Sequence, residues 1–244
     1  MKCIILAAGY ATRLYPLTEN FPKPLLEVNG TTILDHLIND LETKKQIDEY
    51  IVISNHKFYE IFKDWAKNHK CKITVLDDGT ETNETRLGAV KDIKFAIDTL
   101  SIKDDCLVMA GDNLLDFSLT KFIDYALNKK TSCVMRHCEE DINKLRKTGV
   151  LEIDKNEKVI GMEEKPQNPK TNFACPPFYF YLNQDLQLID EALKNGCNTD
   201  APGSLVTWLC TKTIIHAYLM PGNRYDIGNI ESYEKIKNNY KGVR

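Results

Sequence analysis

The chain has 244 residues, of which 43% are hydrophobic and 27% are charged. This length fits one large domain or two small ones with a well-developed core. The formal net charge of −3 provides no basic field that would favour nucleic acid or an anionic membrane. No apolar stretch approaches the roughly 18 residues of a membrane span, and a strand-like run already begins at Cys3, so we expect neither a span nor a signal peptide. These features predict a cytoplasmic protein that binds no nucleic acid and no membrane.

The eight cysteines include no C-x-x-C pair, which argues against a zinc site. Five of them lie in apolar runs with a strand or helix pattern: Cys3, Cys71, Cys106, Cys133 and Cys210. We therefore expect reduced thiols rather than disulfides, as in a reducing compartment.

Apolar runs alternate with helical patterns through the first half of the chain. Strands are predicted over residues 3–6, 50–53, 72–76 and 105–110. Helices are predicted after the N-cap candidates Thr31 and Thr32 and over residues 57–68 and 87–97. This β-α-β alternation predicts an α/β fold of the Rossmann-like, doubly wound type, with a mostly parallel sheet and a ligand crevice at the carboxyl ends of its strands.

Short strand-like segments crowd the second half, which predicts a mixed or antiparallel region added to the sheet. They cover residues 131–137, 149–153, 159–163, 178–182 and 213–219. Helices are predicted over residues 184–193, around 204–210 and from Glu231 onward. We expect a single domain over residues 1–244, with halves of about 1–130 and 131–244. No hexapeptide repeat occurs, so no left-handed β-helix is expected.

Residues 5–26, which we call the phosphate segment, carry the strongest signal in the sequence. The apolar strand ends in Leu6, Ala7, Ala8 and Gly9, whose small side chains leave backbone N–H groups open to an anion. Thr12 and Arg13 follow, and the arginine offers a planar fork of donors for phosphate oxygens. Lys23 lies between Pro22 and Pro24, which predicts an extended backbone and a lysine that loses little freedom on binding an anion.

This segment resembles the signature of the sugar-1-phosphate nucleotidyltransferases, which include the glucose-1-phosphate thymidylyl- and uridylyltransferases. Their LAAG-x-G-T-R-L-x-P-x-T…P-K-P pattern is matched from Leu6 to Leu14 and then at Pro16, Thr18 and Pro22-Lys23-Pro24. Ala11 stands where the family usually has a second glycine, and its methyl group leads us to expect a negative φ there.

The resemblance implies a nucleotide-binding half and an acceptor-binding half. Residues 83–90 match the glycine-rich loop that reads the base, with Gly88 retained and Arg86 added. The implied nucleotide-binding residues are Leu6, Ala7, Ala8, Gly9, Thr12, Arg13, Lys23, Asn83, Gly88 and Asp112. The implied acceptor-binding residues are Asn113, Gly149, Glu164 and Lys165, from the segments Gly111-Asp112-Asn113, Thr148-Gly149-Val150 and Glu163-Glu164-Lys165-Pro166. Pro166 is again expected to keep the preceding lysine extended.

Two carboxylates are implied as ligands of a catalytic Mg²⁺. Asp112 follows a predicted strand, and Asp226 lies in Tyr225-Asp226-Ile227-Gly228, which resembles the family's aromatic-x-Asp-x-Gly segment. Mg²⁺ prefers one or two carboxylates together with phosphate oxygens and water.

The implied reaction is direct attack of a sugar 1-phosphate on the α-phosphorus of an NTP, which gives an NDP-sugar and pyrophosphate. Alignment and charge neutralisation dominate such chemistry, and the implied catalytic set is Arg13, Lys23, Asp112, Lys165 and Asp226. A phosphate is already anionic, so the five histidines are read as structural or surface residues.

Two other functions stay open on the sequence. Related cytidylyltransferases use phosphocholine or a phosphonate, and the family's sugar-selecting Glu-x-Glu-Ile segment has no evident counterpart beside Thr199-Asp200-Ala201-Pro202-Gly203. A catalytically inactive nucleotide-binding subunit is the other alternative. The base, the acceptor and the number of subunits in a possible homo-oligomer are not indicated by any residue.

Overall fold

The computed structural model describes residues 1–243, which form two compact units. The first unit contains Met1–Arg86, Ala110–Lys121 and the chain from Pro221 onward. The second unit contains Leu87–Met109 and Phe122–Met220. The chain therefore enters the first unit three times, and each unit is described below by itself.

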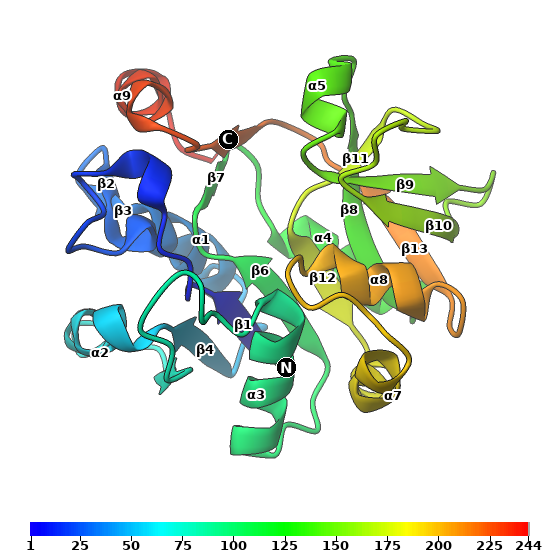
Figure 1. Cartoon of the computed structure of the whole chain (residues 1–244), viewed down its shortest axis with the longest axis horizontal. Coiled ribbons are helices and arrows are strands. Elements are labelled where there is room, and N and C mark those ends of the chain that lie inside the picture. Colours follow the sequence, from blue (N-terminus) through cyan, green and yellow to red (C-terminus); the bar gives the residue numbers. More distant parts are fainter. Residues whose placement is uncertain (244) are drawn as a thin grey trace. The chain divides into compact units, whose positions relative to one another are not determined.

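A parallel sheet forms the centre of the first unit (Figure 1). Its strands are β1 (Lys2–Leu6), β4 (Glu49–Ser54) and β5 (Ile73–Asp77), with β4 in the middle. Helices α1 (Ile33–Glu42) and α2 (Tyr59–Ala66) complete the β-α-β pattern. The Thr32 hydroxyl caps α1 by accepting a hydrogen bond from the Asp35 N–H at 3.0 Å, as the N-cap prediction requires.

The remaining elements of the first unit are short, except α9. They are the 3-10 turns η1 (Thr12–Leu14), η2 (Lys23–Leu25) and η3 (His56–Phe58), the hairpin β2 (Glu27–Val28) and β3 (Thr31–Thr32), the antiparallel ribbon of β7 (Asn113–Leu115) and β14 (Arg224–Asp226), and α9 (Ile230–Asn239). Apolar residues from the phosphate segment, β7 and α9 share one small core, which includes Leu14, Leu114 and Tyr233. This core fixes the ribbon beside the phosphate segment.

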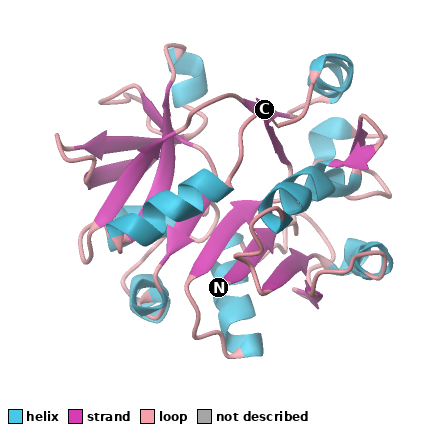
Figure 2. Cartoon of the chain, turned by 180° about the vertical axis from the view of Figure 1, so that it is seen from behind, coloured by secondary structure: helices cyan, strands magenta, loops and turns pink. Residues whose placement is uncertain are grey.

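The second unit is built on a sheet that is largely antiparallel. Its strands follow the order β10 (Val159–Glu164), β9 (Gly149–Ile153), β11 (Phe173–Cys175), β8 (Ser132–Cys138), β12 (Phe178–Tyr181) and β6 (Cys106–Ala110), and β13 (Ile215–Leu219) pairs in parallel with β8. Its helices are α3 (Ala89–Leu100), α4 (Thr120–Lys129), α5 (Ile142–Leu145), α6 (Asn183–Leu186), α7 (Ile189–Lys194) and α8 (Gly203–Leu209). In the view from behind, α4 crosses these strands, and its Phe122 and Tyr125 rings contact Tyr218 of β13 (Figure 2).

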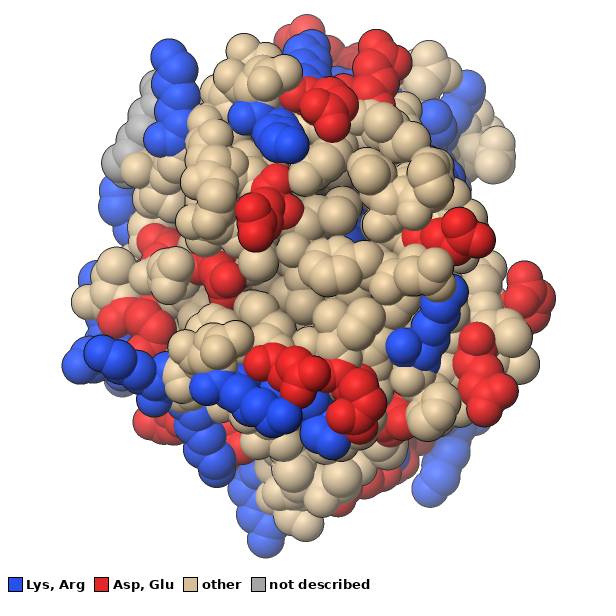
Figure 3. Space-filling view, turned by 90° about the vertical axis from the view of Figure 1, so that its left-hand side faces the viewer, with Lys and Arg blue, Asp and Glu red and all other residues tan. Residues whose placement is uncertain are grey.

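The predicted α/β class with an added antiparallel region is confirmed. One predicted element is wrong: residues 184–193 form two short helices, α6 and α7, rather than one. Helices α4 and α5 and strands β2, β3, β7, β11 and β14 were not predicted. All eight cysteines are free, as expected. Over residues 1–243, no helix combines the length and the apolar character that crossing a bilayer requires. On the face shown in Figure 3, positive and negative side chains are interspersed around an uncharged centre.

Candidate active site

Part of the backbone directly after β1 is hydrogen-bonded to the neighbouring strand β4. The Ala7 N–H donates to the Ile53 carbonyl at 3.0 Å, so this amide does not face the expected anion site. Gly9 is exposed, and a Cβ atom built on it would meet nothing within 4 Å. Ala8 is buried as well, so of Ala7, Ala8 and Gly9 only Gly9 is exposed where an anion was expected.

Ala11 adopts a left-handed conformation, with φ 47° and ψ 40°, so the expected negative φ is wrong. Its carbonyl accepts hydrogen bonds from the Leu14 N–H at 2.9 Å and the Thr18 hydroxyl at 2.8 Å. These two contacts hold a backbone shape that costs an alanine about 1–2 kcal/mol. The loop thus keeps the conformation that glycine favours although its methyl group is present.

Lys23 is the first residue of the 3-10 turn η2, so the expected extended backbone is also wrong here. The turn is closed by hydrogen bonds from the Leu25 N–H to the Pro22 carbonyl and from the Leu26 N–H to the Lys23 carbonyl, both at 3.0 Å. The Lys23 side chain is buried, and its Nζ lies 2.7 Å from Asp112 Oδ2.

Asp112 reaches Lys23 because the chain turns sharply beside β1. The Gly111 N–H donates to the Leu6 carbonyl at 3.1 Å, and a Cβ at Gly111 would lie 3.0 Å from Ile5 Cγ2. Desolvation pushes the pKa of Asp112 upward, but the charge and hydrogen bond of Lys23 outweigh it and, with the charge of Arg224, lower that pKa. Asp112 is therefore an anion in direct contact with a cation.

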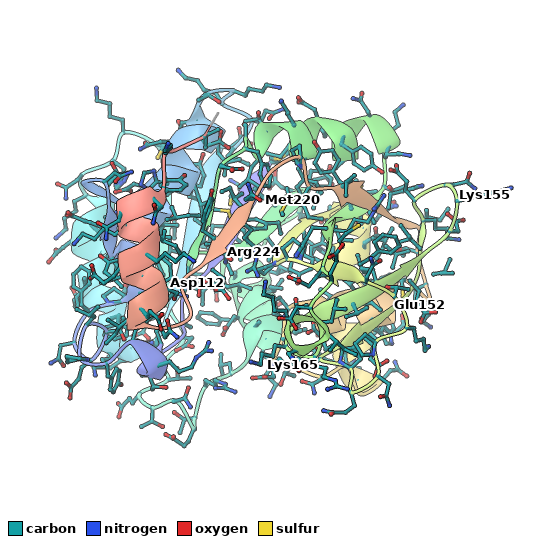
Figure 4. The ribbon with its side chains drawn as sticks, turned by 90° about the horizontal axis from the view of Figure 1, so that it is seen from above. Asp112, Glu152, Lys155, Lys165, Met220 and Arg224 are labelled. Carbon is teal, nitrogen blue, oxygen red and sulfur yellow. The ribbon has the colours of Figure 1, made fainter. Side chains whose placement is uncertain are left out.

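Asp226 lies on the strand next to Asp112. In the β7/β14 ribbon it is directly opposite Asn113, the residue after Asp112, and its side chain is exposed. Opposed residues in an antiparallel pair have Cα atoms about 4.5–5.5 Å apart. Arg224 Nη1 donates to Asn113 Oδ1 at 2.7 Å, and Figure 4 shows Arg224 beside Asp112. The first unit thus gathers two carboxylates and two cations.

The other nucleotide-binding candidates of the first unit lie on its surface. Thr12 and Arg13 are exposed in η1. In the expected base-reading loop, Arg86 Nη1 donates to Asn83 Oδ1 at 3.0 Å. Three residues before this loop, the Thr80 carbonyl accepts a hydrogen bond from the hydroxyl of Tyr10, in the phosphate segment, at 2.9 Å.

Gly88 lies in the second unit, directly before α3, with φ 91° and ψ 149°. A Cβ at this position would lie 2.5 Å from the Thr199 carbonyl oxygen. That carbonyl accepts from the Val90 N–H at 3.0 Å, and the Asp200 carbonyl accepts from the Ala89 N–H at 3.3 Å. Glycine is therefore required here by the close approach of residues 199–200.

The acceptor-binding candidates of the second unit are gathered at one end of β9 and β10. Gly149 and Glu164 are directly opposite each other, and a Cβ at Gly149 would lie 3.2 Å from Glu164 Oε1. Desolvation raises the pKa of Glu164, and Asp200 adds to that effect, while Lys165 and a hydrogen bond from the Gly203 amide oppose it.

Lys165 has φ 50°, so the expected extended conformation is wrong for this lysine as well. Its N–H donates to the Thr148 carbonyl at 3.0 Å, which continues the β9/β10 pairing past the end of β10. Its Nζ is exposed and lies 3.7 Å from Asp200 Oδ2.

Two charged residues that contact predicted site residues were not themselves predicted from the sequence to belong to the site. Asp200 faces Lys165, and Arg224 supports Asn113. The sequence held a signal for Arg224, since it precedes Asp226 by two residues and alternate residues of a strand share one face. A strand of three residues is too short for its periodicity to be recognised.

A family model described as "Nucleotidyl transferase" matches residues 2–242. The bifunctional protein GlmU of Methanocaldococcus jannaschii is 34% identical over 191 residues, which cover 78% of this chain and 42% of that protein. The glucose-1-phosphate adenylyltransferase of Fervidobacterium nodosum is 25% identical over 245 residues, covering 94% of this chain and 59% of that protein. The chain therefore spans about half the length of these relatives.

Solved structures share the fold at lower identity. UDP-glucose pyrophosphorylase complexed with UDP-glucose superposes with a TM-score of 0.82 at 19% identity, covering 98% of this chain and 97% of that one. The apo form of UDP-glucose pyrophosphorylase gives a TM-score of 0.83 at 19% identity and covers 98% of both chains.

Proposed function

Because the chain belongs to the nucleotidyl transferase family, we propose that it couples an NTP to a sugar 1-phosphate and releases pyrophosphate. The observation that carries this proposal is the contact of Lys23 with Asp112 beside the phosphate segment, with Asp226 on the neighbouring strand. Cations that can bind phosphate and carboxylates that can bind a divalent ion thus lie together in the first unit.

In this proposal a phosphate oxygen of the acceptor attacks the α-phosphorus of the NTP in line, the new P–O bond forms, and the bond to the pyrophosphate oxygen breaks. Pyrophosphate carries away the electron pair of the broken bond. Arg13 and Lys23 bind the triphosphate and neutralise the charge that develops on the leaving group. Lys165 binds the phosphate of the acceptor, which reduces the repulsion between two anions.

Asp112 and Asp226 suit a magnesium ion. Both are carboxylates, Asp112 is kept ionised by its neighbours, and Asp226 is exposed across the ribbon from Asn113. Such a hard cation takes one or two carboxylates and leaves its other positions to phosphate oxygens and water. A bound Mg²⁺ would neutralise phosphate charge.

The sugar is proposed to bind where Gly149 faces Glu164. Gly149 lets Glu164 come close, because a Cβ at Gly149 would lie 3.2 Å from Glu164 Oε1 and 2.3 Å from Met162 Cε. The Glu164 carboxylate offers hydrogen-bond acceptors to sugar hydroxyls. Asp200 contributes a second carboxylate beside Lys165, so the acceptor region contains both a cation for phosphate and anions for hydroxyl groups.

The test is a matrix of the common NTPs against sugar 1-phosphates, phosphocholine and a phosphonate, with pyrophosphate release measured in each well. We expect release with at least one NTP and one sugar 1-phosphate. Release with phosphocholine or a phosphonate alone would indicate the cytidylyltransferase alternative. Nucleotide binding without release in any well would indicate an inactive subunit and would refute the proposed reaction.

A further inference from the structure

A chain of two hydrogen bonds joins Arg224 to Asp112. Arg224 Nη1 donates to Asn113 Oδ1 at 2.7 Å, and Asn113 Nδ2 donates to Asp112 Oδ1 at 2.9 Å. The Asn113 side chain between them is buried, with the residue 1% exposed. The Asn113 amide itself is therefore shielded from water.

Arg224 determines which way the Asn113 amide points. A guanidinium has only donors, and a carboxylate has only acceptors. The amide must therefore present its oxygen to Arg224 and its NH₂ group to Asp112. If the amide were reversed, its NH₂ group would face the donors of Arg224 and its oxygen would face the Asp112 carboxylate.

The two oxygens of Asp112 are held by different partners. Lys23 contacts Oδ2 at 2.7 Å, whereas Asn113 contacts Oδ1. Lys23 is also the residue proposed to bind phosphate, so a bound nucleotide would compete with Asp112 for the Lys23 ammonium group. The contact through Asn113 does not depend on Lys23.

The geometry of β14 places Arg224 next to the second carboxylate, Asp226. Arg224 and Asp226 are alternate residues of β14 and lie on one face of the ribbon. Asn113 is opposite Asp226 and occupies the same face. Strand β14, with three residues, thus supplies both the Asp226 carboxylate and Arg224, the residue that orients Asn113.

We propose that Arg224 is a positioning residue, which acts through Asn113 to hold the Asp112 carboxylate in the orientation that binds a divalent cation. This inference rests on the proposed function for its kinetic readout but not for its binding readout. Loss of a group that orients a metal ligand typically lowers metal affinity or activity by about 10- to 100-fold.

The binding experiment uses Mn²⁺ alone, titrated into protein without nucleotide and followed by electron paramagnetic resonance. We expect Arg224→Gln and Asn113→Ala each to raise the Mn²⁺ Kd about tenfold and the double variant to raise it no further, because both changes break one chain. If Arg224 acted only through its charge, its loss would instead tighten Mn²⁺ binding, since one positive charge fewer would face the ion. An unchanged or lower Kd for Arg224→Gln, or losses that multiply in the double variant, would overturn the proposal.

The kinetic experiment uses the NTP and acceptor on which the wild type is active. Arg224→Gln should lower kcat about tenfold and leave the KM for NTP within about twofold, because Arg224 contacts Asn113 rather than the nucleotide. Arg224→Lys should recover part of the rate, since lysine can donate to Asn113 Oδ1 but lacks the rigid fork. A raised KM with unchanged kcat would contradict the positioning role.

The matched control is Arg146→Gln in the second unit. Arg146 also donates through its guanidinium, from Nε to the Gln167 carbonyl at 2.9 Å, and we expect wild-type kcat and Mn²⁺ Kd for this variant. Melting temperatures close to that of the wild type show that each variant is folded. A wild type without transfer would refute the proposed function, whereas the Mn²⁺ titration would still decide the role of Arg224.

Discussion

Gly88→Ala tests whether the close approach of residues 199–200 to α3 is real. The added Cβ would lie 2.5 Å from the Thr199 carbonyl oxygen, whereas ordinary contact begins at 3.4 Å, so this oxygen must move by about 0.9 Å. The shift would break the hydrogen bond from the Val90 N–H to Thr199. In addition, φ 91° with ψ 149° lies in a region that only glycine adopts readily, at a cost of about 1–3 kcal/mol to other residues.

Together with overpacking of about 1–3 kcal/mol, we expect Gly88→Ala to lower the free energy of unfolding by about 3 kcal/mol. For a chain of this size that corresponds to a melting temperature about 6–12 °C lower. Urea unfolding followed by circular dichroism, with a thermal scan, measures both quantities.

The matched control is Gly196→Ala in the same unit. Gly196 has φ 82°, but a Cβ there would meet nothing within 4 Å, so only the conformational cost of about 1 kcal/mol is expected. The difference between the two variants therefore reports the clash with Thr199 together with the additional conformational cost of the Gly88 backbone. Equal unfolding free energies for both variants would refute the packing described for Gly88.

Two further predictions concern stability. Ala11→Gly should raise the free energy of unfolding, measured by urea denaturation, by up to about 1 kcal/mol, because glycine adopts the left-handed backbone without strain. A decrease in the free energy of unfolding by more than about 1 kcal/mol would show that the loop is not left-handed. Burial opposes ionisation of Glu49, but hydrogen bonds from Thr74, Lys2 and Lys72 outweigh it and lower the pKa of Glu49 from 4.5 to about 2. Its stabilisation is therefore complete above pH 4.5 and is lost as the pH falls through about 2, so Glu49→Gln should be less stable than the wild type by about 2–3 kcal/mol at pH 7. The two unfolding free energies should converge toward pH 2, and a constant difference would contradict this assignment.

Local signals in the sequence predict the elements with clear periodicity. The Thr32 cap and the helix that follows it were predicted correctly because side-chain capping acts within one helix. The resemblance named Gly149 and Glu164 as acceptor-binding residues, but their opposition in the sheet was not predicted, since no local rule gives the register of two strands.

The backbone at three key residues could not be predicted from local preference. Lys23 and Lys165 both precede proline, which favours extended backbone, yet hydrogen bonds of η2 and the contact with Thr148 override that preference. Ala11 is held left-handed by hydrogen bonds to its carbonyl from Leu14 and Thr18. These contacts span several residues, and they decide conformations that single-residue rules leave open.

The proposed reaction is tested directly by transfer of label from an α-³²P-labelled NTP to a sugar 1-phosphate. We expect the wild type to form a labelled NDP-sugar and to release unlabelled pyrophosphate. Asp112→Asn should lower the rate by about 100-fold or more, as loss of one preorganised electrostatic group does elsewhere. Asp98→Asn, an exposed residue of α3 that pairs with Lys94, should keep the wild-type rate. Near-normal transfer by Asp112→Asn, or no labelled product from the wild type with any pair, would contradict the account.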